Sequence, residues 1–232
     1  MIRRFTNLMV SDLLLDQNAP NPLHARYTAH IPSHCSLLLG TAFALVRPEF
    51  SKLRAASLRR RQGKLARLLV CMGGCDPENE TVKVLAGLAL SHPPGLHVDV
   101  VIGSGNPHRA EVEIACSRLP NAHLHVQTAQ MAELMAAADC AINAGGSTTW
   151  ERCTLGLPGI VTVDADNQVE IAQAVHRAGG QRNLGWYTHL RAEDYARAIA
   201  DLTPEHLQSM SAAAARICDG QGAARVAACL LQ

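Results

Sequence analysis

The sequence predicts an α/β fold in which a doubly wound parallel sheet extends from about residue 64 to residue 232. Short apolar runs typical of buried strands alternate there with segments whose apolar residues recur at helical spacing. Hydrophobic residues make up 48% of the chain and charged residues 18%, which is enough apolar material for a sizeable core. Alternating strands and helices of this length favour parallel pairing through right-handed crossovers.

Five strands are expected in this region, each an apolar run that stops at glycine or at a polar loop. They cover residues 65–72, 98–103, 123–127, 139–144 and 159–163. Helices are expected between the strands, where apolar residues such as Val84, Leu85 and Leu88 lie on one helical face. The tail is expected to form helices over residues 192–201, 204–218 and 220–231.

Residues 1–50 hold short apolar runs that are interrupted by prolines. Residues 13–15 and 35–40 have the composition of buried strands, but about 50 residues seldom close a stable core alone. We therefore interpret residues 1–50 as the remnant of a second, N-terminal domain. Residues 51–63 are rich in arginine and are interpreted as a basic linker, solvated and flexible; contact with a phosphate or a partner is the alternative.

The composition argues against several classes of function. The net charge of +1 and the 3% aromatic content disfavour nucleic acid and an anionic membrane as partners. No apolar run approaches the roughly 18 residues of a membrane span, so a soluble, cytoplasmic protein is expected. The 8 cysteines include no C-x-x-C pair and are expected to be buried, reduced thiols. Neither a metal ion nor a cofactor is expected in the protein.

Doubly wound sheets bind ligands beyond the carboxyl ends of their strands, which directs attention to the loop after the fourth strand. This loop opens a helix and reads Gly145-Gly146-Ser147-Thr148-Thr149. The glycines allow a diphosphate to approach backbone N–H groups, and the hydroxyls add donors. An ordinary capped strand-to-helix turn is the alternative, because the loop is neither G-x-G-x-x-G nor a P-loop.

Three other places near the expected crevice carry polar groups or glycines. Glu151 lies just inside the helix after the turn, where its carboxylate can accept both ribose hydroxyls or simply stabilise the helix by about 0.3–1 kcal/mol. Asn167 and Gln168 follow the fifth strand, where their amides can reach a sugar or phosphate, or cap a helix. Gly73 and Gly74 follow the first strand and offer access to the backbone.

Several segments, taken in order, form a set that is far more specific than any one of them. They are Leu14-Leu15-Asp16-Gln17-Asn18, residues 39–50, Met72-Gly73-Gly74-Cys75-Asp76-Pro77, residues 144–152, Gly156-Leu157-Pro158 and Asn167-Gln168. Together these blocks resemble the UDP-2,4-diacetamido-2,4,6-trideoxy-β-L-altropyranose hydrolases of pseudaminic acid biosynthesis, over nearly the whole chain. That family is similar to GT-B glycosyltransferases, so the resemblance implies a GT-B-like fold with a UDP-sugar between two Rossmann-like domains.

The resemblance also implies roles for individual residues. The turn at residues 145–149 would hold the diphosphate, and Glu151 would hold the ribose. Uracil would lie against residues 126–131, which include Met131, while Asn167 and Gln168 would face the sugar and the diphosphate. The implied reaction is metal-independent removal of UDP, in which water attacks the anomeric carbon of the sugar.

The chain departs from this family at its N-terminal end. Family members have a strand and a Gly-x-Gly-His turn whose histidine is the proposed base, and none of the 11 histidines here lies in such a turn. We therefore expect no catalytic residue in this chain, which would begin within the N-terminal domain. Three hypotheses remain: a UDP-sugar hydrolase without its base, a related UDP-sugar glycosyltransferase, and a non-catalytic UDP-sugar-binding module. Exposed apolar surface on residues 1–50 is expected to favour self-association.

Overall fold

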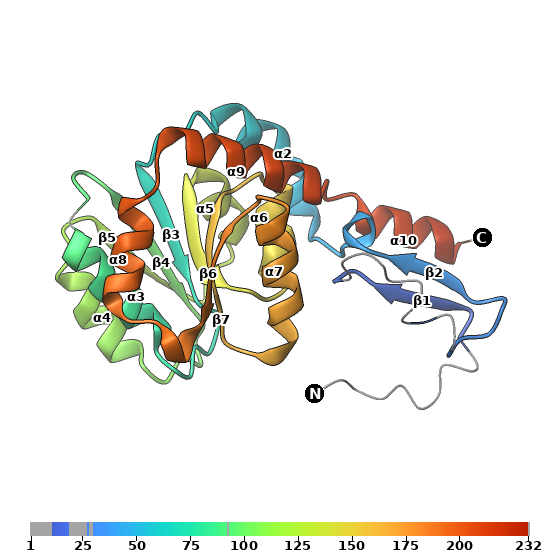
Figure 1. Cartoon of the computed structure of the whole chain (residues 1–232), viewed down its shortest axis with the longest axis horizontal. Helices are drawn as coiled ribbons and strands as arrows, with labels where there is room; N and C mark the ends of the chain where they lie inside the picture. The colour runs from blue at the N-terminus through green and yellow to red at the C-terminus, as the bar shows by residue number, and fades with distance from the viewer. Residues whose placement is uncertain (1–10, 19–26, 28–29, 92, 232) are drawn as a thin grey trace.

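The structure, a computed structural model, describes residues 11–18, 27, 30–91 and 93–231. Its main body is a six-stranded parallel sheet with helices on both faces, and a smaller lobe lies at one side (Figure 1). The strand order is β5-β4-β3-β6-β7-β8. The strands are β3 (Arg67–Cys71), β4 (His97–Ile102), β5 (Ala122–Val126), β6 (Cys140–Ala144), β7 (Gly159–Val163) and β8 (Arg182–Trp186).

The strand order reverses between β3 and β6. The chain runs outward from β3 through β4 to β5, returns to β6 on the other side of β3, and continues outward to β8. Connections from the two halves leave the sheet toward opposite faces, so the loops at the carboxyl ends of β3 and β6 diverge. A crevice is therefore expected at this end of the sheet, beside these two strands.

Helices cover both faces of the sheet. They are α2 (Pro48–Arg60), α3 (Glu80–Ser91), α4 (Arg109–Ser117), α5 (Met131–Ala137), α6 (Thr148–Thr154), α7 (Val169–Arg177), α8 (Ala192–Ala200), α9 (Pro204–Ile217) and α10 (Gly222–Leu230). The short 3-10 helices are η1 (Thr41–Phe43), η2 (Asp166–Gln168) and η3 (Tyr187–His189). One buried cluster joins the sheet to α3, α4 and α8, and a second joins it to α2, α5, α6 and α7.

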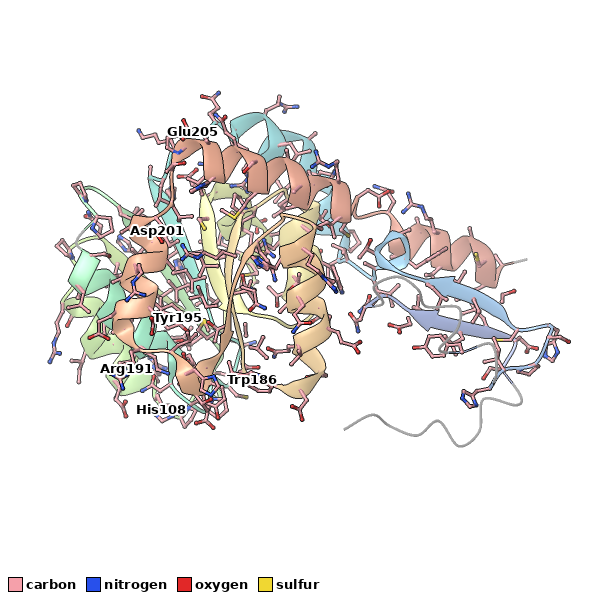
Figure 2. All side chains as sticks on the ribbon, viewed as in Figure 1. His108, Trp186, Arg191, Tyr195, Asp201 and Glu205 are labelled. Atoms are coloured by element: carbon pink, nitrogen blue, oxygen red, sulfur yellow. The ribbon has the colours of Figure 1, made fainter. Side chains whose placement is uncertain are left out.

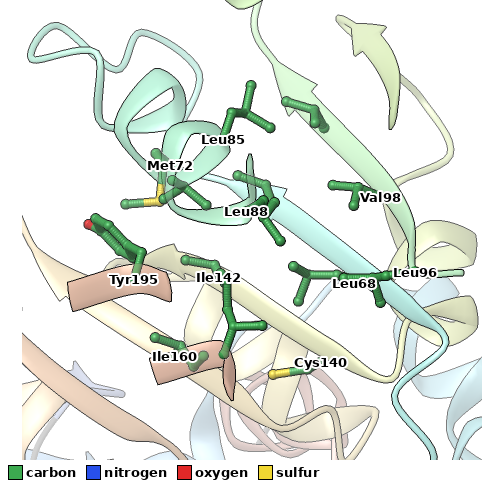
Figure 3. Close-up of a cluster of buried hydrophobic side chains, with 14 of the residues drawn as sticks. Leu68, Met72, Leu85, Leu88, Leu96, Val98, Cys140, Ile142, Ile160 and Tyr195 are labelled. Carbon is green, nitrogen blue, oxygen red and sulfur yellow. The ribbon is translucent and has the colours of Figure 1, made fainter. Parts of the chain in front are cut away.

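Each central strand buries alternate residues in opposite clusters. Leu68 and Val70 of β3 pack with Leu88 of α3 and Tyr195 of α8. The Tyr195 side chain lies between α8 and the sheet (Figures 2 and 3). Leu69, between them in sequence, packs in the cluster on the other face. Burial on both faces explains why these strands appear in the sequence as continuous apolar runs.

The parallel α/β fold predicted for this region is confirmed, and so are all five expected strands and the tail helices. The edge strand β8 was not predicted. Its sequence, Arg-Asn-Leu-Gly-Trp, contains no apolar run, and each of its residues is only partly buried. Its register against β7 also shifts between Val161 and Thr162, so it lacks the regular pattern by which a central strand is detected.

Residues 51–63 do not form the flexible linker that the sequence suggested, because most of them belong to α2. Pro48 occupies the first turn of this helix, where its missing N–H has no intrahelical partner to lose. Phe50 and Ser57 are buried against the main body. The segment is therefore an ordered part of the fold.

The arginines of this segment explain the difference. Arg54, Arg60 and Arg61 donate hydrogen bonds to carbonyls at the C-terminal ends of neighbouring helices, where C=O groups lack intrahelical partners and attract cations. The accepting carbonyls are those of Met135, Ala136, Ala138, Thr154, Leu155, Ala215 and Cys218. The expectation of solvated arginines is wrong for these three, because charge patterning carries no information about such partners.

The smaller lobe contains the two strands expected in residues 1–50. Strand β1 (Leu13–Asp16) pairs in parallel with β2 (Ser36–Leu39), as a sheet separate from the main one. Helix α10 lies beside this pair (Figure 1). Residues 1–10, 19–26 and 28–29 of the same region lie outside the described residues. Among the described helices, none combines the length and the apolar character needed to cross a lipid bilayer.

Candidate functional site

A cavity of about 250 Å³ opens at the carboxyl ends of β3 and β4. Its walls come from the loops after β3, β4 and β5, from the first turns of α5 and α6, and from the residue that precedes α2. The lining residues are Arg47, Cys71, Gly73, Gly74, Val101, Ile102, Gly103, Gln127, Thr128, Met131, Thr148 and Glu151. This is the end of the sheet at which doubly wound folds bind ligands.

Glycines form the floor of the cavity after β3. Gly73 has a φ of 105°, which L side chains rarely adopt, and a Cβ on Gly73 or Gly74 would meet no atom within 4 Å. A Cβ on Gly103 would instead lie 2.5 Å from the carbonyl oxygen of Gly74, to which the Gly103 N–H donates at 3.0 Å. Glycine thus allows the two loops to touch and leaves backbone accessible to a ligand.

The turn at residues 145–149 is only partly available to a ligand. The N–H of Gly145 donates to the carbonyl of Thr162 at 3.1 Å and to Oε1 of Gln168 at 3.2 Å. The side chain of Thr149 is fully buried, and its Oγ1 has no hydrogen-bond partner among the described residues. By contrast, no hydrogen bond within the described chain uses the N–H groups of Gly146, Ser147 or Thr148.

The Gln168 side chain links the loop after β6 to the loop after β7 through hydrogen bonds. Its Oε1 accepts from the N–H groups of Gly145 and Asp164, at 3.2 and 3.1 Å, and its Nε2 donates to Oδ1 of Asp164. Burial raises the pKa of Asp164, an effect that the bond from Gln168 opposes. Asn167 is exposed in η2, and neither amide lines the cavity. The structure thus favours a local structural role for the Gln168 side chain.

Glu151 is held by a residue from a distant part of the chain. Nε of Arg47 donates to Oε1 of Glu151 at 2.8 Å, and the hydrogen bond raises the pKa of Arg47. Another nitrogen of the same guanidinium lies 3.3 Å from Oε1 of Glu49, and the guanidinium carbon lies 4.9 Å from the centre of the Phe50 ring. Glu151 therefore lines the cavity as the hydrogen-bonded partner of Arg47.

The opposite wall of the cavity is shaped by the segment after β5. Gln127 adopts a φ of 54°, unusual for a residue with a side chain, and its N–H donates to the carbonyl of Ile102 at 2.9 Å. Its Oε1 accepts from the N–H of Ser104 at 3.2 Å. Thr128 accepts from the N–H of Gln130 at 3.0 Å, just before α5 begins at Met131. These bonds hold the wall against the end of β4.

Cys71 contributes a thiol to the cavity, and burial raises its pKa above the ordinary value. A thiol with a raised pKa is neutral near pH 7 and is a poor nucleophile. Within the described chain, no group of three or more histidine, cysteine, aspartate or glutamate side chains is arranged to hold a metal ion. Glu151 is the carboxylate among the described lining residues.

The structure thus places only some of the expected binding residues in the cavity. Gly73, Gly74, Met131, Thr148 and Glu151 line the cavity. The expected residues that do not line it are Gly145, Gly146, Ser147, Thr149, Asn167 and Gln168.

Arg47 lines the cavity but was not singled out from the sequence. The residue stands directly before Pro48, and a charged residue there looks like the start of an ordinary helix. Arg47 lies within residues 39–50, one of the segments that carry the family resemblance, and this was the signal that could have identified it.

Solved structures with a similar fold include MurG of Acinetobacter baumannii, with a TM-score of 0.66 and 14% identity over 93% of this chain and 64% of that chain. The UDP-GlcNAc 2-epimerase of Neisseria meningitidis, solved with UDP-GlcNAc bound, has a TM-score of 0.62 and 19% identity over 88% of this chain and 57% of that one. At these identities the likeness concerns the fold. The fold matches that of GT-B glycosyltransferase structures such as MurG.

A curated relative is the spore coat polysaccharide biosynthesis protein SpsG of Bacillus subtilis (strain 168), which is 28% identical over 163 residues. The match covers 69% of this chain and 47% of SpsG, so the chain spans about half the length of that relative.

The model of the glycosyltransferase family 28 C-terminal domain matches residues 68–227. This range begins in β3, ends in α10, and contains the cavity-lining residues other than Arg47. The chain therefore belongs to the glycosyltransferase family 28 C-terminal domain family.

Proposed function

We propose that this chain is the nucleotide-binding part of a UDP-sugar hydrolase that acts on UDP-2,4-diacetamido-2,4,6-trideoxy-β-L-altropyranose or a close analogue. The observation that carries the proposal is the cavity at the carboxyl ends of β3 and β4, with glycine backbone on its floor and Glu151 in its wall. Such a site offers N–H donors to a diphosphate and a carboxylate acceptor to a ribose, which are the two groups a nucleoside diphosphate presents.

We assign the parts of UDP to the cavity as follows. The diphosphate lies between Gly73-Gly74 and the turn before α6. There the N–H of Thr148, in the cavity wall, and those of Gly146 and Ser147, next to it in the turn, have no other partner in the described chain. The ribose hydroxyls donate to Glu151. Uracil lies against the wall that contains Gln127 and Met131.

The cavity offers little that can activate water. Glu151 is paired with Arg47, and the Cys71 thiol has a raised pKa. A general base needs a proton-accepting group within hydrogen-bond reach of the attacking water. We therefore assign no catalytic base to the described lining residues and expect this chain alone to bind UDP without turning over a UDP-sugar.

A related UDP-sugar glycosyltransferase is the second candidate, favoured by the family match at residues 68–227. A transferase would bind UDP through the same contacts and would differ from a hydrolase in the group that attacks the anomeric carbon. A non-catalytic UDP-sugar-binding module is the third, consistent with the pairing of Glu151 with Arg47 and the raised pKa of the Cys71 thiol.

Calorimetry with UDP tests the binding assignment. We expect saturable binding of UDP and of several UDP-sugars with similar affinities, because the assigned contacts reach the nucleotide and not the sugar. A folded sample that gives no heat with UDP would remove the basis of the proposal.

A product assay tests the reaction class. The chain is incubated with the UDP-sugar in ¹⁸O-labelled water, with and without candidate acceptor sugars, and UDP release is followed. We expect release no higher than in buffer. Free sugar labelled at the anomeric carbon would refute the missing-base argument in favour of hydrolysis, and a glycosylated acceptor would establish the transferase instead.

A further inference from the structure

We propose that Arg47 is a positioning residue, which fixes the Glu151 carboxylate so that the site selects nucleoside diphosphates with free ribose 2′ and 3′ hydroxyls. This inference rests on the proposed function, because it concerns the same cavity. It adds a residue that the sequence did not single out and gives this residue an effect on how strongly the ribose hydroxyls are bound.

Arg47 has several partners, although its side chain is 51% exposed. Its guanidinium carbon lies 4.9 Å from the centre of the Phe50 ring, a distance typical of a cation–π contact. Phe50 is fully buried in α2, and Glu49 approaches the guanidinium at 3.3 Å. Arg54, further along α2, ties this helix to carbonyls of the main body. Arg47 thus stands directly before a helix that is packed against the main body.

The two oxygens of Glu151 differ in their surroundings. Arg47 occupies Oε1 through a bond of 2.8 Å, while Oε2 has no hydrogen-bond partner among the described residues. An ionised carboxylate has about four lone-pair sites, so it can keep the arginine and still accept from hydroxyls. A glutamate without Arg47 would lose rotamer freedom when it binds a ligand, and the arginine removes much of that loss in advance.

A positioning role for Arg47 differs from direct contact with phosphate. The Arg47 guanidinium already faces two carboxylates, those of Glu49 and Glu151, so much of its charge is compensated within the protein. Its Nε donates to Glu151 and a second nitrogen faces Glu49, so a diphosphate could be reached only by the remaining N–H groups, whose charge is already partly compensated. The geometry thus points to an action through Glu151.

The test is a set of binding measurements by calorimetry on wild type, Arg47→Ala, Glu151→Ala and the double variant. Each is titrated with UDP and with 2′,3′-dideoxyuridine diphosphate, which lacks both hydroxyls. We expect Glu151→Ala to weaken UDP binding by about 5- to 150-fold. Arg47→Ala should weaken it by about tenfold, which corresponds to about 1.4 kcal/mol.

The selectivity pattern is the readout that a merely structural role would not produce. Arg47→Ala should leave the affinity for the dideoxy ligand unchanged and should add no further loss to Glu151→Ala. Arg59→Ala, at an exposed position of the same helix, is the matched control and should bind both ligands as wild type does. Circular dichroism of each variant confirms that it is folded.

Three outcomes would overturn the inference. If Arg47→Ala loses affinity equally for both ligands, Arg47 contacts the phosphate directly. If its affinity for UDP is unchanged, Arg47 has no role in binding. If the wild type binds both ligands equally, the ribose hydroxyls do not contribute to binding. In each of these cases wild-type UDP binding still stands, so the proposed nucleotide-binding role survives; the third outcome removes only the assignment of the ribose to Glu151. A wild type that binds neither ligand defeats the proposed function itself.

Discussion

Glu151 and Arg152 are adjacent in the sequence but have different surroundings. Glu151 lines the cavity, whereas the Arg152 side chain is fully buried. One terminal nitrogen of Arg152 donates to the carbonyls of Leu157 and Gly180, at 2.8 and 3.1 Å. A Cβ on Gly159 would lie 2.6 Å from the guanidinium carbon, so glycine is needed there to make room. Part of this block therefore serves packing and not ligand binding.

Asp99 of β4 is another buried charge, 4% exposed, on the sheet face opposite the α3 cluster. It accepts from Nε2 of His125 at 2.9 Å and from Arg67 at 3.3 Å, and His97 lies 3.4 Å away. Burial acts to raise the pKa of Asp99, but the bonds from His125 and Arg67 outweigh it and hold the pKa below its ordinary value.

The depressed pKa of Asp99 predicts a pH dependence of stability. The ionised carboxylate stabilises the fold above its unfolded pKa of about 4, and this stabilisation is lost as the pH falls through the folded pKa. Asp99→Asn is expected to lower the free energy of unfolding by about 1–3 kcal/mol at pH 7 and by less at pH 3. Urea denaturation at the two pH values measures this, and an equal loss at both would contradict it.

Helix α2 shows how an element that looks like a linker can organise a fold. It lies against α5 and α6, and its arginines reach the ends of α5, α6 and α9. The helix also begins directly after Arg47, so its position determines where this side chain meets Glu151. Packing in the main body is thereby linked to the geometry of the cavity.

We expect Arg54→Ala to lower the free energy of unfolding by about 2–4 kcal/mol, because it leaves three carbonyls without their charged donor. Arg59→Ala on the same helix removes an exposed arginine and is expected to change stability by less than about 0.5 kcal/mol. Guanidinium or urea denaturation compares the two. Equal, small effects would restore the interpretation of this segment as a solvated connector.

The described part of the protein consists of a large body and a small lobe. The β1–β2 sheet has two strands, and sheets of two strands are marginal in water without further packing. Trp150 of α6 joins the body to the lobe by donating to Asn18 at 2.9 Å. Leu45, Leu230 and Leu231, in the segments that pack beside this sheet, are 53%, 67% and 88% exposed.

These exposed leucines predict self-association, because apolar surface of this kind is removed from water when copies meet. Sedimentation velocity should show an average mass that rises with protein concentration. Leu230→Glu should shift the equilibrium toward monomer by about tenfold or more, since burying a carboxylate is costly. Ile114→Glu, at a similarly exposed position on α4, is the control and should not. A monomer at every concentration would contradict the prediction.

Local patterns were sufficient for much of the fold. The five expected strands of the main sheet were predictable because strands buried on both faces are continuous apolar runs, and the loops beyond them because glycine marks them. Strand β8 was not, since its half-buried residues form no such run. The interpretation of residues 51–63 as a linker was wrong because the partners of its arginines lie on other helices.

The candidate site likewise combines residues that the sequence indicates with contacts that depend on the tertiary structure. Gly73, Gly74 and Glu151 could be chosen from the sequence, because each lies in or just after a loop at the carboxyl end of a strand. The pairing of Arg47 with Glu151 joins residues 104 positions apart, and the bonds of Gly145 and the burial of Thr149 depend on the neighbouring strand and helices. Such contacts are decided by the packing of the whole sheet, and a packing contact between distant segments leaves no periodic signal in either of them.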